Sequence, residues 1–272
     1  METLTQNDTA ISPAEERQYM VIEAAMEAAE ILLENGAEIS RVEETFERIC
    51  QHFGVRDASV FVLSNGIFAT GFNHSQPQSY ASVKHLPVKE VDLAKVVAVN
   101  QLSRELTKQA FSVDEVLERL RRIRVLPGRR QSIAIPATGL GSAAFCYLFG
   151  GGIKEAVPAF VIGLVLQIYL GSLCRRRSKI LRITTASLLV TALALLTYRF
   201  GWIERIAQLI IGVVVPMIPG VAFVNGIRDF TQGDYIAGSV RLLDALVVFA
   251  SIALGVGLMI GLYRQLGGQV WM

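Results

Sequence analysis

The sequence predicts a soluble α+β domain, with helices and a three-stranded sheet, followed by an all-α membrane domain of five transmembrane helices. Residues 1–130 carry 19 acidic and 15 basic side chains, which is the charge density of a soluble domain. Residues 131–272 carry only 5 acidic and 11 basic side chains, spread between long apolar runs. Runs of about 20 apolar residues match the thickness of a bilayer core. We therefore expect a cytoplasmic domain at 1–130 and a transmembrane domain at 131–272.

The composition excludes several classes of function. The net charge of +2 arises from local clusters that topology explains, so we expect no nucleic-acid partner. The first 18 residues are polar and acidic, and we expect no cleavable signal peptide. Three scattered cysteines give no disulfide framework. The sequence contains no GxSxG, P-loop or Gly-rich dinucleotide motif and no metal-ligand spacing, so we expect no enzyme, cofactor or metal.

The first elements of the soluble domain are two helices. "ERQYMVIEAAMEAAEILLENGAE" has an apolar face opposite acidic residues, as in an amphipathic helix, and Gly36 is placed to end it in a left-handed cap. Ser40 and Glu43 have the spacing of a reciprocal capping box that opens a second helix. Ser112 and Glu115 repeat this pattern before a last soluble helix at 113–124.

Between these helices the apolar period changes to two, which predicts strands. "ASVFVLSNGIFATGF" contains two β-rich runs around Asn65-Gly66, the dipeptide that favours a type I′ hairpin. "YASVKHLPV" predicts a third strand, and "EVDLAKVVAVNQLSRELTKQ" predicts a helix. The expected order is two helices, three strands and two helices.

The apolar runs of the second half predict five spans, at 132–150, 156–174, 180–199, 206–224 and 239–263. The clusters "RLRRIRVLPGRR" and "RRRSK" flank these runs on what we expect to be the cytoplasmic side. The N-terminal domain is then cytoplasmic and the C-terminus lies outside. Small residues in the spans favour close packing within the chain, with an intersubunit contact as the alternative: Gly139, Gly141, Gly257 and Gly261.

Two prolines interrupt the fourth span. Pro216 and Pro219 remove backbone donors and break the helix. Broken helices at membrane depth are tolerated where protein or a water-filled cavity surrounds them, and in transporters they commonly form the substrate site. A helix restarting at Gly220 would offer free N–H groups suited to a carboxylate. The alternative is a kinked helix of purely structural importance.

Charged residues follow this break. Arg228, Asp229 and Asp234 fall in the expected inner loop, where solvated charge costs little. Arg241 and Asp244 lie three positions apart at the start of the fifth span and can neutralise each other there. Both a loop-and-interface role and a gating or proton-coupling role are compatible with this pattern.

Two stretches of the sequence resemble the threonine/serine exporter family, in particular its split form, in which two small membrane proteins do the work of one long exporter. "LLENGAEISRVEETFERIC" is similar to the family's soluble-domain signature through Gly36, Ser40, Arg41, Val42 and Glu43. "PGVAFVNGIRDFTQGDYIAGSVRLLDAL" is similar to its membrane signature through Pro219, Gly220, Asn225, Arg228, Asp229, Gly233, Asp234, Gly238 and Arg241.

The resemblance implies export of small carboxylates, either amino acids such as threonine and serine or dicarboxylates such as succinate. It also implies a second small membrane subunit, since the long form continues beyond five spans, and a higher oligomer is compatible with it. With no nucleotide-binding motif, we expect an exporter in the bacterial inner (plasma) membrane that is driven by the proton gradient. The competing hypothesis is a membrane-anchored sensing or regulatory protein, which five spans and a doubly broken helix disfavour.

The candidate site residues fall into three groups. The residues expected along the substrate path are Pro216, Pro219, Gly220, Asn225, Arg228 and Asp229. The residues expected to act in coupling or gating are Asp234, Arg241 and Asp244. Arg41 and Glu43 are expected to be structural, or to connect the soluble domain with the membrane half, and Ser40 is expected to cap its helix.

Overall fold

The computed structural model describes residues 13–72, 79–86, 91–128, 130–173 and 178–269. Its internal contacts divide the chain into two compact units. Unit 1 contains residues 1–126 together with 224–241, and unit 2 contains residues 127–223 together with 242–272. Residues 224–241 therefore pack with the N-terminal part of the chain, which a single boundary at residue 130 does not anticipate.

Unit 1 has the predicted order of two helices, three strands and two helices. The elements are α1 (Pro13–Glu34), α2 (Ile39–His52), β1 (Ala58–Leu63), β2 (Gly66–Phe72), β3 (Ser79–His85), α3 (Leu93–Leu106) and α4 (Val113–Arg124). Most of α9 (Gly220–Thr231) and the first turns of α10 (Tyr235–Gln265) complete the unit. The strands form one antiparallel sheet in the order β1-β2-β3.

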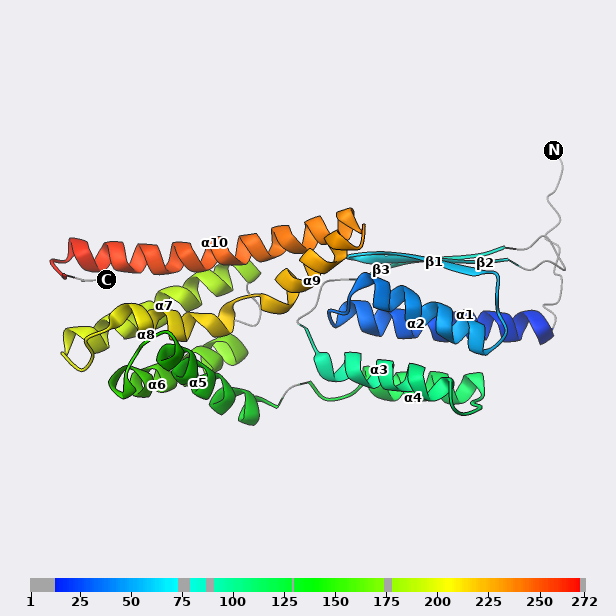
Figure 1. Ribbon diagram of the computed structural model, residues 1–272, viewed down its shortest axis with the longest axis horizontal. Helices are drawn as coiled ribbons and strands as arrows, with labels where there is room; N and C mark the ends of the chain where they lie inside the picture. The colour runs from blue at the N-terminus through cyan, green and yellow to red at the C-terminus, as the bar shows by residue number, and fades with distance from the viewer. Residues whose placement is uncertain (1–12, 73–78, 87–90, 129, 174–177, 270–272) are drawn as a thin grey trace. The chain divides into compact units, whose positions relative to one another are not determined.

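Helices α1 and α2 form the middle layer of unit 1, with the sheet on one side and α3 and α4 on the other (Figure 1). Because neighbours cover α1 from several directions, it is buried over more than the single face that its sequence predicts. Its small residues Ala24, Ala25, Ala28 and Ala29 are fully buried. At its edge, the Arg124 guanidinium from α4 pairs with Glu27 and Glu30 of α1, which links these two helices.

Several local predictions are confirmed. Helix α1 ends at Glu34, Gly36 has φ +87°, and the amides of Gly36 and Ala37 bond to the carbonyls of Leu33 and Leu32. This is the Schellman pattern that glycine favours at a helix end. Ser112 and Glu115 form the expected reciprocal capping box at α4.

Two local predictions are wrong. The hairpin pairs Leu63 with Gly66 across Ser64 and Asn65, and no non-glycine residue in the described chain has positive φ, so the turn is not type I′. Helix α2 begins at Ile39 with Glu38 at its N-cap, and no side chain of its own caps it. Ser40 therefore lies inside the helix, and Glu43 instead accepts the amide of Val62 on β1.

Unit 2 is helical in its described part. It contains α5 (Gln131–Leu148), α6 (Ile153–Ile168), the π-helical turn η1 (Tyr169–Leu173), α7 (Lys179–Arg199), α8 (Ile206–Val214), the 3₁₀ turn η2 (Val215–Met217) and most of α10. Three helices in the described chain are long and apolar enough to cross a membrane: Ile153–Gly171, Lys179–Arg199 and Tyr235–Gln265. The broken segment Ile206–Met217 with Gly220–Thr231, bent by 63°, makes four if it counts as one span.

The five predicted spans are therefore not confirmed. The expected first span, 132–150, does form helix α5, but it is not among the segments that are long and apolar enough to cross. Polar and small residues along α5 lower its mean hydropathy: Gln131, Ser132, Thr138, Gly139, Gly141 and Ser142. Of the flanking clusters that predict the orientation, Arg129, Arg175, Arg176, Arg177 and residues 270–272 lie outside the described residues.

Glycines set the helix spacing in unit 2. A Cβ on Gly163 of α6 would lie 2.9 Å from the Cα of Gly139 on α5, and one on Gly255 of α10 would lie 2.5 Å from the Thr184 carbonyl on α7. A Cβ on Gly141, Gly257 or Gly261 would meet no other part of the described chain within 4 Å. The expectation of close packing within the chain thus holds for Gly139 and is wrong for the other three.

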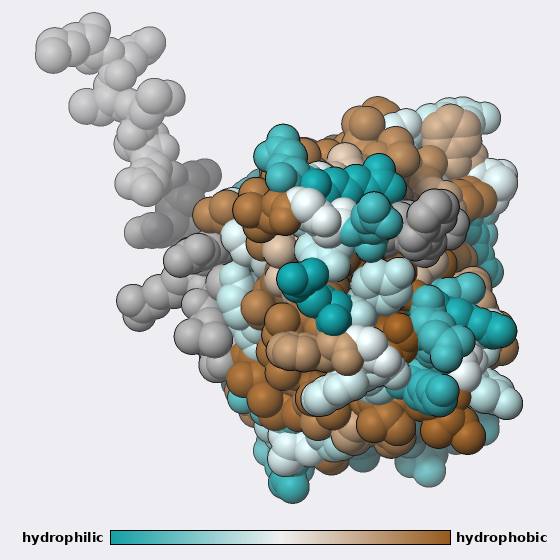
Figure 2. All heavy atoms as spheres, turned by 90° about the vertical axis from the view of Figure 1, so that its left-hand side faces the viewer, coloured by the Kyte–Doolittle hydropathy of each residue, from teal (hydrophilic) through white to brown (hydrophobic). Residues whose placement is uncertain are grey.

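The outward surface of unit 2 is strongly apolar. Large exposed side chains occur on each of its helices, including Leu140, Val161, Leu188, Ile211, Leu254 and Leu258. In Figure 2, which looks onto the end of this unit, hydrophobic side chains make up much of the outer surface and hydrophilic ones gather in patches. Such a surface suits contact with lipid, where the solvent is as apolar as the side chains.

Candidate functional site

The predicted break in the fourth span is present. Helix α8 ends at Val214, Val215–Met217 form one 3₁₀ turn, and Ile218 is extended with φ −65° and ψ 128°. Helix α9 then restarts at Gly220, whose amide donates to the Ile218 carbonyl at 2.8 Å, and the Phe223 amide donates to the Pro219 carbonyl. The amides of Val221 and Ala222 precede this ladder, as the first amides of any helix do. A Cβ on Gly220 would meet no other atom of the described residues within 4 Å, so these residues leave the approach to this helix start open.

Further along α9, three polar residues share one face and bind the turn between α1 and α2. Asn225 Nδ2 donates to the Gly36 carbonyl at 2.9 Å, and Arg228 Nη1 lies 2.7 Å from Glu38 Oε1. Asp229 Oδ1 accepts the amide of Ile39, the first residue of α2, at 3.4 Å. Asp229 therefore takes the place of the missing local cap of α2, and its charge faces the positive end of that helix.

Arg241 at the start of α10 completes this arrangement. Its Nη2 donates to the Ala37 carbonyl at 2.7 Å, and its Nη1 lies 2.9 Å from Asp229 Oδ2. Asp229 is fully buried and the Arg241 side chain is 12% exposed. We call the four side chains Asn225, Arg228, Asp229 and Arg241, with residues 36–39, the turn cluster.

Glycines allow the turn cluster to assemble. A Cβ on Gly238 would lie 2.8 Å from the Phe230 amide nitrogen and 2.9 Å from the Gly226 carbonyl oxygen, so only glycine lets α10 approach α9 this closely. That approach brings Arg241 beside Asp229. A Cβ on Gly36 would lie 2.8 Å from Val91 Cγ2, which fixes the turn against the segment before α3.

The expected pairing of Arg241 with Asp244 is wrong. Arg241 pairs with Asp229, and Asp244 instead pairs with Lys179 at the start of α7, with 2.5 Å between Nζ and Oδ2. Residues three apart on a helix share a face only approximately, and here each charge finds a closer partner on another element. Asp234 directly precedes α10, and its carbonyl accepts the Gly238 amide.

The structure thus gathers Gly36, Asn225, Arg228, Asp229 and Arg241 into one cluster. Pro216, Pro219 and Gly220 form the break, and Asp244 belongs to a different pair. Arg41 lies 3.9 Å from Glu38, at the edge of the cluster. Sequence reasoning missed Glu38 and Lys179. Glu38 lies in "GAEIS", between the motif residues Gly36 and Ser40. Lys179 ends the basic run "RRRSK", which was interpreted only as a sign of membrane orientation.

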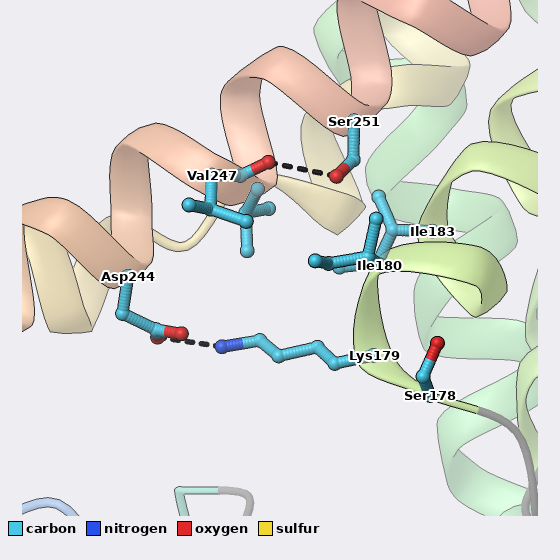
Figure 3. A pocket seen from close by; sticks show the side chains of 8 residues that line it. Ser178, Lys179, Ile180, Ile183, Asp244, Val247 and Ser251 are labelled. Atoms are coloured by element: carbon cyan, nitrogen blue, oxygen red, sulfur yellow. Dashed lines mark hydrogen bonds and ion pairs between the residues drawn. The ribbon is translucent and has the colours of Figure 1, made fainter.

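Lys179 and Asp244 stand at the mouth of a pocket of about 270 Å³ in unit 2. Its walls come from α7 and α10: Ser178, Ile180, Ile183, Val247, Val248 and Ser251. Figure 3 shows the Lys179 side chain extending from α7 toward Asp244, with Ile180, Ile183 and Val247 above it in this view and Ser251 above them.

Comparison with known proteins identifies the family. The model described as "Putative threonine/serine exporter" matches residues 23–263. The chain is 24% identical over 242 residues to "Probable succinate transporter subunit YjjP" of Klebsiella aerogenes, covering 88% of this chain and 92% of that protein. No solved structure matches it significantly.

Other relatives are much longer than the segment they share with this chain. "Probable threonine/serine exporter" of Mycobacterium tuberculosis is 22% identical over 241 residues, which cover 87% of this chain and 45% of that protein. "Uncharacterized protein C16A10.01" of Schizosaccharomyces pombe is 26% identical over 183 residues, which cover 64% of this chain and 22% of that protein. The chain thus spans less than half the length of these two relatives.

Proposed function

Because the chain belongs to the threonine/serine exporter family, we propose that it is one subunit of a two-component secondary exporter of small carboxylate metabolites. The solutes in question are amino acids such as threonine and serine, or dicarboxylates such as succinate. The chain is a membrane protein, with at least three apolar helices long enough to cross. In this proposal it resides in the inner (plasma) membrane, with its N-terminal domain in the cytoplasm, its C-terminus outside, and the proton gradient as the driving force.

The observation that carries the proposal is the broken segment at 215–219. An extended residue between two helices inside an apolar segment requires protein or water around it, which is the setting of substrate sites in transporters. The restarted helix presents its positive end there, and that end favours a carboxylate. Pro216, Pro219 and Gly220 are thus assigned to the substrate path.

The turn cluster has a different role in this proposal. The polar atoms of Asn225, Arg228, Asp229 and Arg241 bind the 36–39 turn, which supports a role in holding α9 and α10 in place beside the substrate path. The buried Asp229–Arg241 pair is formed in this structure, and gating would require a second state in which it is broken. We therefore assign Asp229 and Arg241 to gating, with Asp234 beside them at the start of α10.

A partner subunit is part of the proposal. The K. aerogenes relative, which matches this chain over 92% of its own length, is named as a transporter subunit. The M. tuberculosis relative is named as an exporter, and it is about twice as long as the segment that matches this chain. A second small membrane protein similar to the remainder of the long relative would complete the transporter.

Export is tested with proteoliposomes that contain the chain and the membrane subunit that copurifies with it, loaded with labelled serine, threonine or succinate. At least one solute should leave faster than from liposomes with either subunit alone. If all three leave at the same rate as from single-subunit liposomes, export of these solutes is refuted.

A pair of variants tests the broken segment itself. Gly220→Val places a branched side chain at the open start of α9, where its Cβ meets no other atom of the described residues within 4 Å, so it should slow efflux severalfold without lowering the melting temperature. Gly257→Val is the matched control, because Gly257 is also helical and also has no neighbour within 4 Å. Equal efflux from both variants would remove the break from the solute path.

A further inference from the structure

We propose that the pocket between α7 and α10 binds the zwitterionic head of an α-amino acid, with Lys179 on its carboxylate and Asp244 on its ammonium group. The inference deepens the proposed function, on which it rests, by selecting amino acids over dicarboxylates as the solute class. Neither Lys179 nor the pocket belongs to the turn cluster or to the broken segment.

The charged pair has bonding capacity left over. The Lys179 side chain is 46% exposed and that of Asp244 is 41% exposed, so both heads remain accessible at the mouth of the pocket. An ammonium has three donors and a carboxylate has about four acceptor sites, and the described contacts between Lys179 and Asp244 use one of each. A ligand with both charges can therefore join the pair without leaving either side chain unpartnered.

Charge decides which ligand fits. An α-amino acid carries its ammonium and carboxylate groups on neighbouring atoms, so it presents to Asp244 and Lys179 the two charges that complement them. A dicarboxylate with one carboxylate on Lys179 would place its second carboxylate near Asp244. The two negative charges would repel each other in this partly apolar site and weaken binding.

The rest of the pocket suits a small side chain with a hydroxyl group. Its volume of about 270 Å³ is slightly below the range of about 300–1,000 Å³ for drug-sized ligands, which indicates a metabolite of few atoms. Ile180, Ile183, Val247 and Val248 supply apolar walls. Ser251 donates its hydroxyl hydrogen to the Val247 carbonyl, so its oxygen remains able to accept from a ligand hydroxyl.

The test is equilibrium binding of labelled L-serine to the chain in nanodiscs, together with the membrane subunit that copurifies. Lys179→Met keeps the apolar stem and removes the charge, and Asp244→Asn keeps the shape and removes the charge. Each should weaken binding at least about tenfold, since each removes a charge-assisted hydrogen bond. Lys154→Met is the matched control: Lys154 also pairs with an acidic residue in unit 2, Glu204, but lines no described pocket.

Competing ligands test the requirement for both charges. Glycerate lacks the ammonium group and serine methyl ester lacks the carboxylate, so each should compete at least about tenfold more weakly than L-serine. Should Lys179→Met or Asp244→Asn not yield folded protein, the double variant Lys179→Asp with Asp244→Lys restores an opposite pair, and its binding is measured instead.

The outcomes separate this inference from the proposed function. Serine binding that depends on Lys179 and Asp244 but not on Lys154 supports the zwitterion site. Serine binding that all three variants retain, or succinate binding that depends on Lys179 alone, overturns it. Efflux that persists in Lys179→Met proteoliposomes also overturns it while leaving the exporter proposal intact.

Discussion

The Asp229 carboxylate and the Arg241 guanidinium lie 2.9 Å apart in unit 1, and Asp229 is fully buried. The same carboxylate accepts the amide at the start of α2, and the same guanidinium donates to the carbonyl of Ala37. One ion pair thus serves two backbone groups of the turn between α1 and α2, and the loss of either partner leaves both a buried charge and an open backbone group.

Asp229→Asn should therefore destabilise the chain strongly. Breaking a buried pair by neutralising one partner costs about 3–5 kcal/mol, because the other charge stays buried without compensation. The melting temperature in detergent measures the effect. The matched control is Glu118→Gln, which breaks an exposed ion pair with Arg122 and should cost less than about 1 kcal/mol.

A double variant separates the pair from its surroundings. Asp229→Asn combined with Arg241→Met removes both charges, so it should cost less than the sum of the two single substitutions. Additive costs would mean that the two side chains act independently, contrary to their contact in the structure.

Gly36 should tolerate substitution less well than Gly54. Both have positive φ, +87° and +80°, so alanine meets a backbone penalty of about 1–2 kcal/mol at either position. Only at Gly36 does the new Cβ also approach Val91, at 2.8 Å, whereas Gly54 has no neighbour within 4 Å. We expect the unfolding free energy to fall further for Gly36→Ala than for Gly54→Ala, and equal losses would show that Val91 moves aside freely.

Two glycines of α10 make a similar comparison in unit 2. Gly255→Leu forces a side chain against the Thr184 carbonyl and Ser187 on α7, and overpacking of this kind costs about 1–3 kcal/mol. Gly257→Leu, two residues further along, points into open space and should leave the thermal stability of the purified chain unchanged. A stable Gly255→Leu variant would contradict the close approach of α7 and α10.

Glu43 should make stability depend on pH. Burial raises the pKa of this carboxyl above its usual 4.5, against the opposing effect of the hydrogen bond from the Val62 amide. The folded chain then holds the proton more tightly than the unfolded chain, so the contribution of Glu43 to stability falls as the pH rises from 4.5 through the folded pKa. The negative charge of Asp234 also raises the pKa of Glu43, because it repels the ionised carboxylate.

Glu43→Gln removes this dependence and keeps an oxygen that can accept the Val62 amide. Relative to the wild type, the variant should therefore gain stability between pH 4.5 and pH 7 in thermal unfolding experiments. A difference in melting temperature that stays constant over this range would show that Glu43 titrates alike in both states.

Sequence reasoning succeeded where the cause is local. Gly36 ends α1, Ser112 caps α4, and the prolines break the fourth span, because each outcome depends on residues a few positions away. It failed where a distant residue displaces the local partner. Helix α2 begins at Ile39, before Ser40, and the Ile39 amide donates to Asp229, which lies 190 positions later than Ile39. Arg241 pairs with Asp229, and Asp244 pairs with Lys179, so Arg241 and Asp244 do not pair with each other.

The sequence predicted which residues form the candidate site, but it did not predict what these residues contact. The motif positions Asn225, Arg228, Asp229 and Arg241 were all identified, but one-dimensional spacing does not show that their polar atoms bind the 36–39 turn. Asp244 was identified from the sequence, but its pairing with Lys179 and the pocket they line were not, since both depend on how α7 packs against α10.

After the Schellman turn at the end of α1, the carbonyls of Gly36 and Ala37 accept hydrogen bonds from Asn225 and Arg241, which lie 189 and 204 positions later in the chain. Synthesis proceeds from the N-terminus, so the ribosome must make the apolar helices of unit 2 before these partners exist. The carbonyls at the end of α1 therefore acquire both of these partners only after residue 241 has been synthesised, so the finished turn shows that synthesis has passed that point.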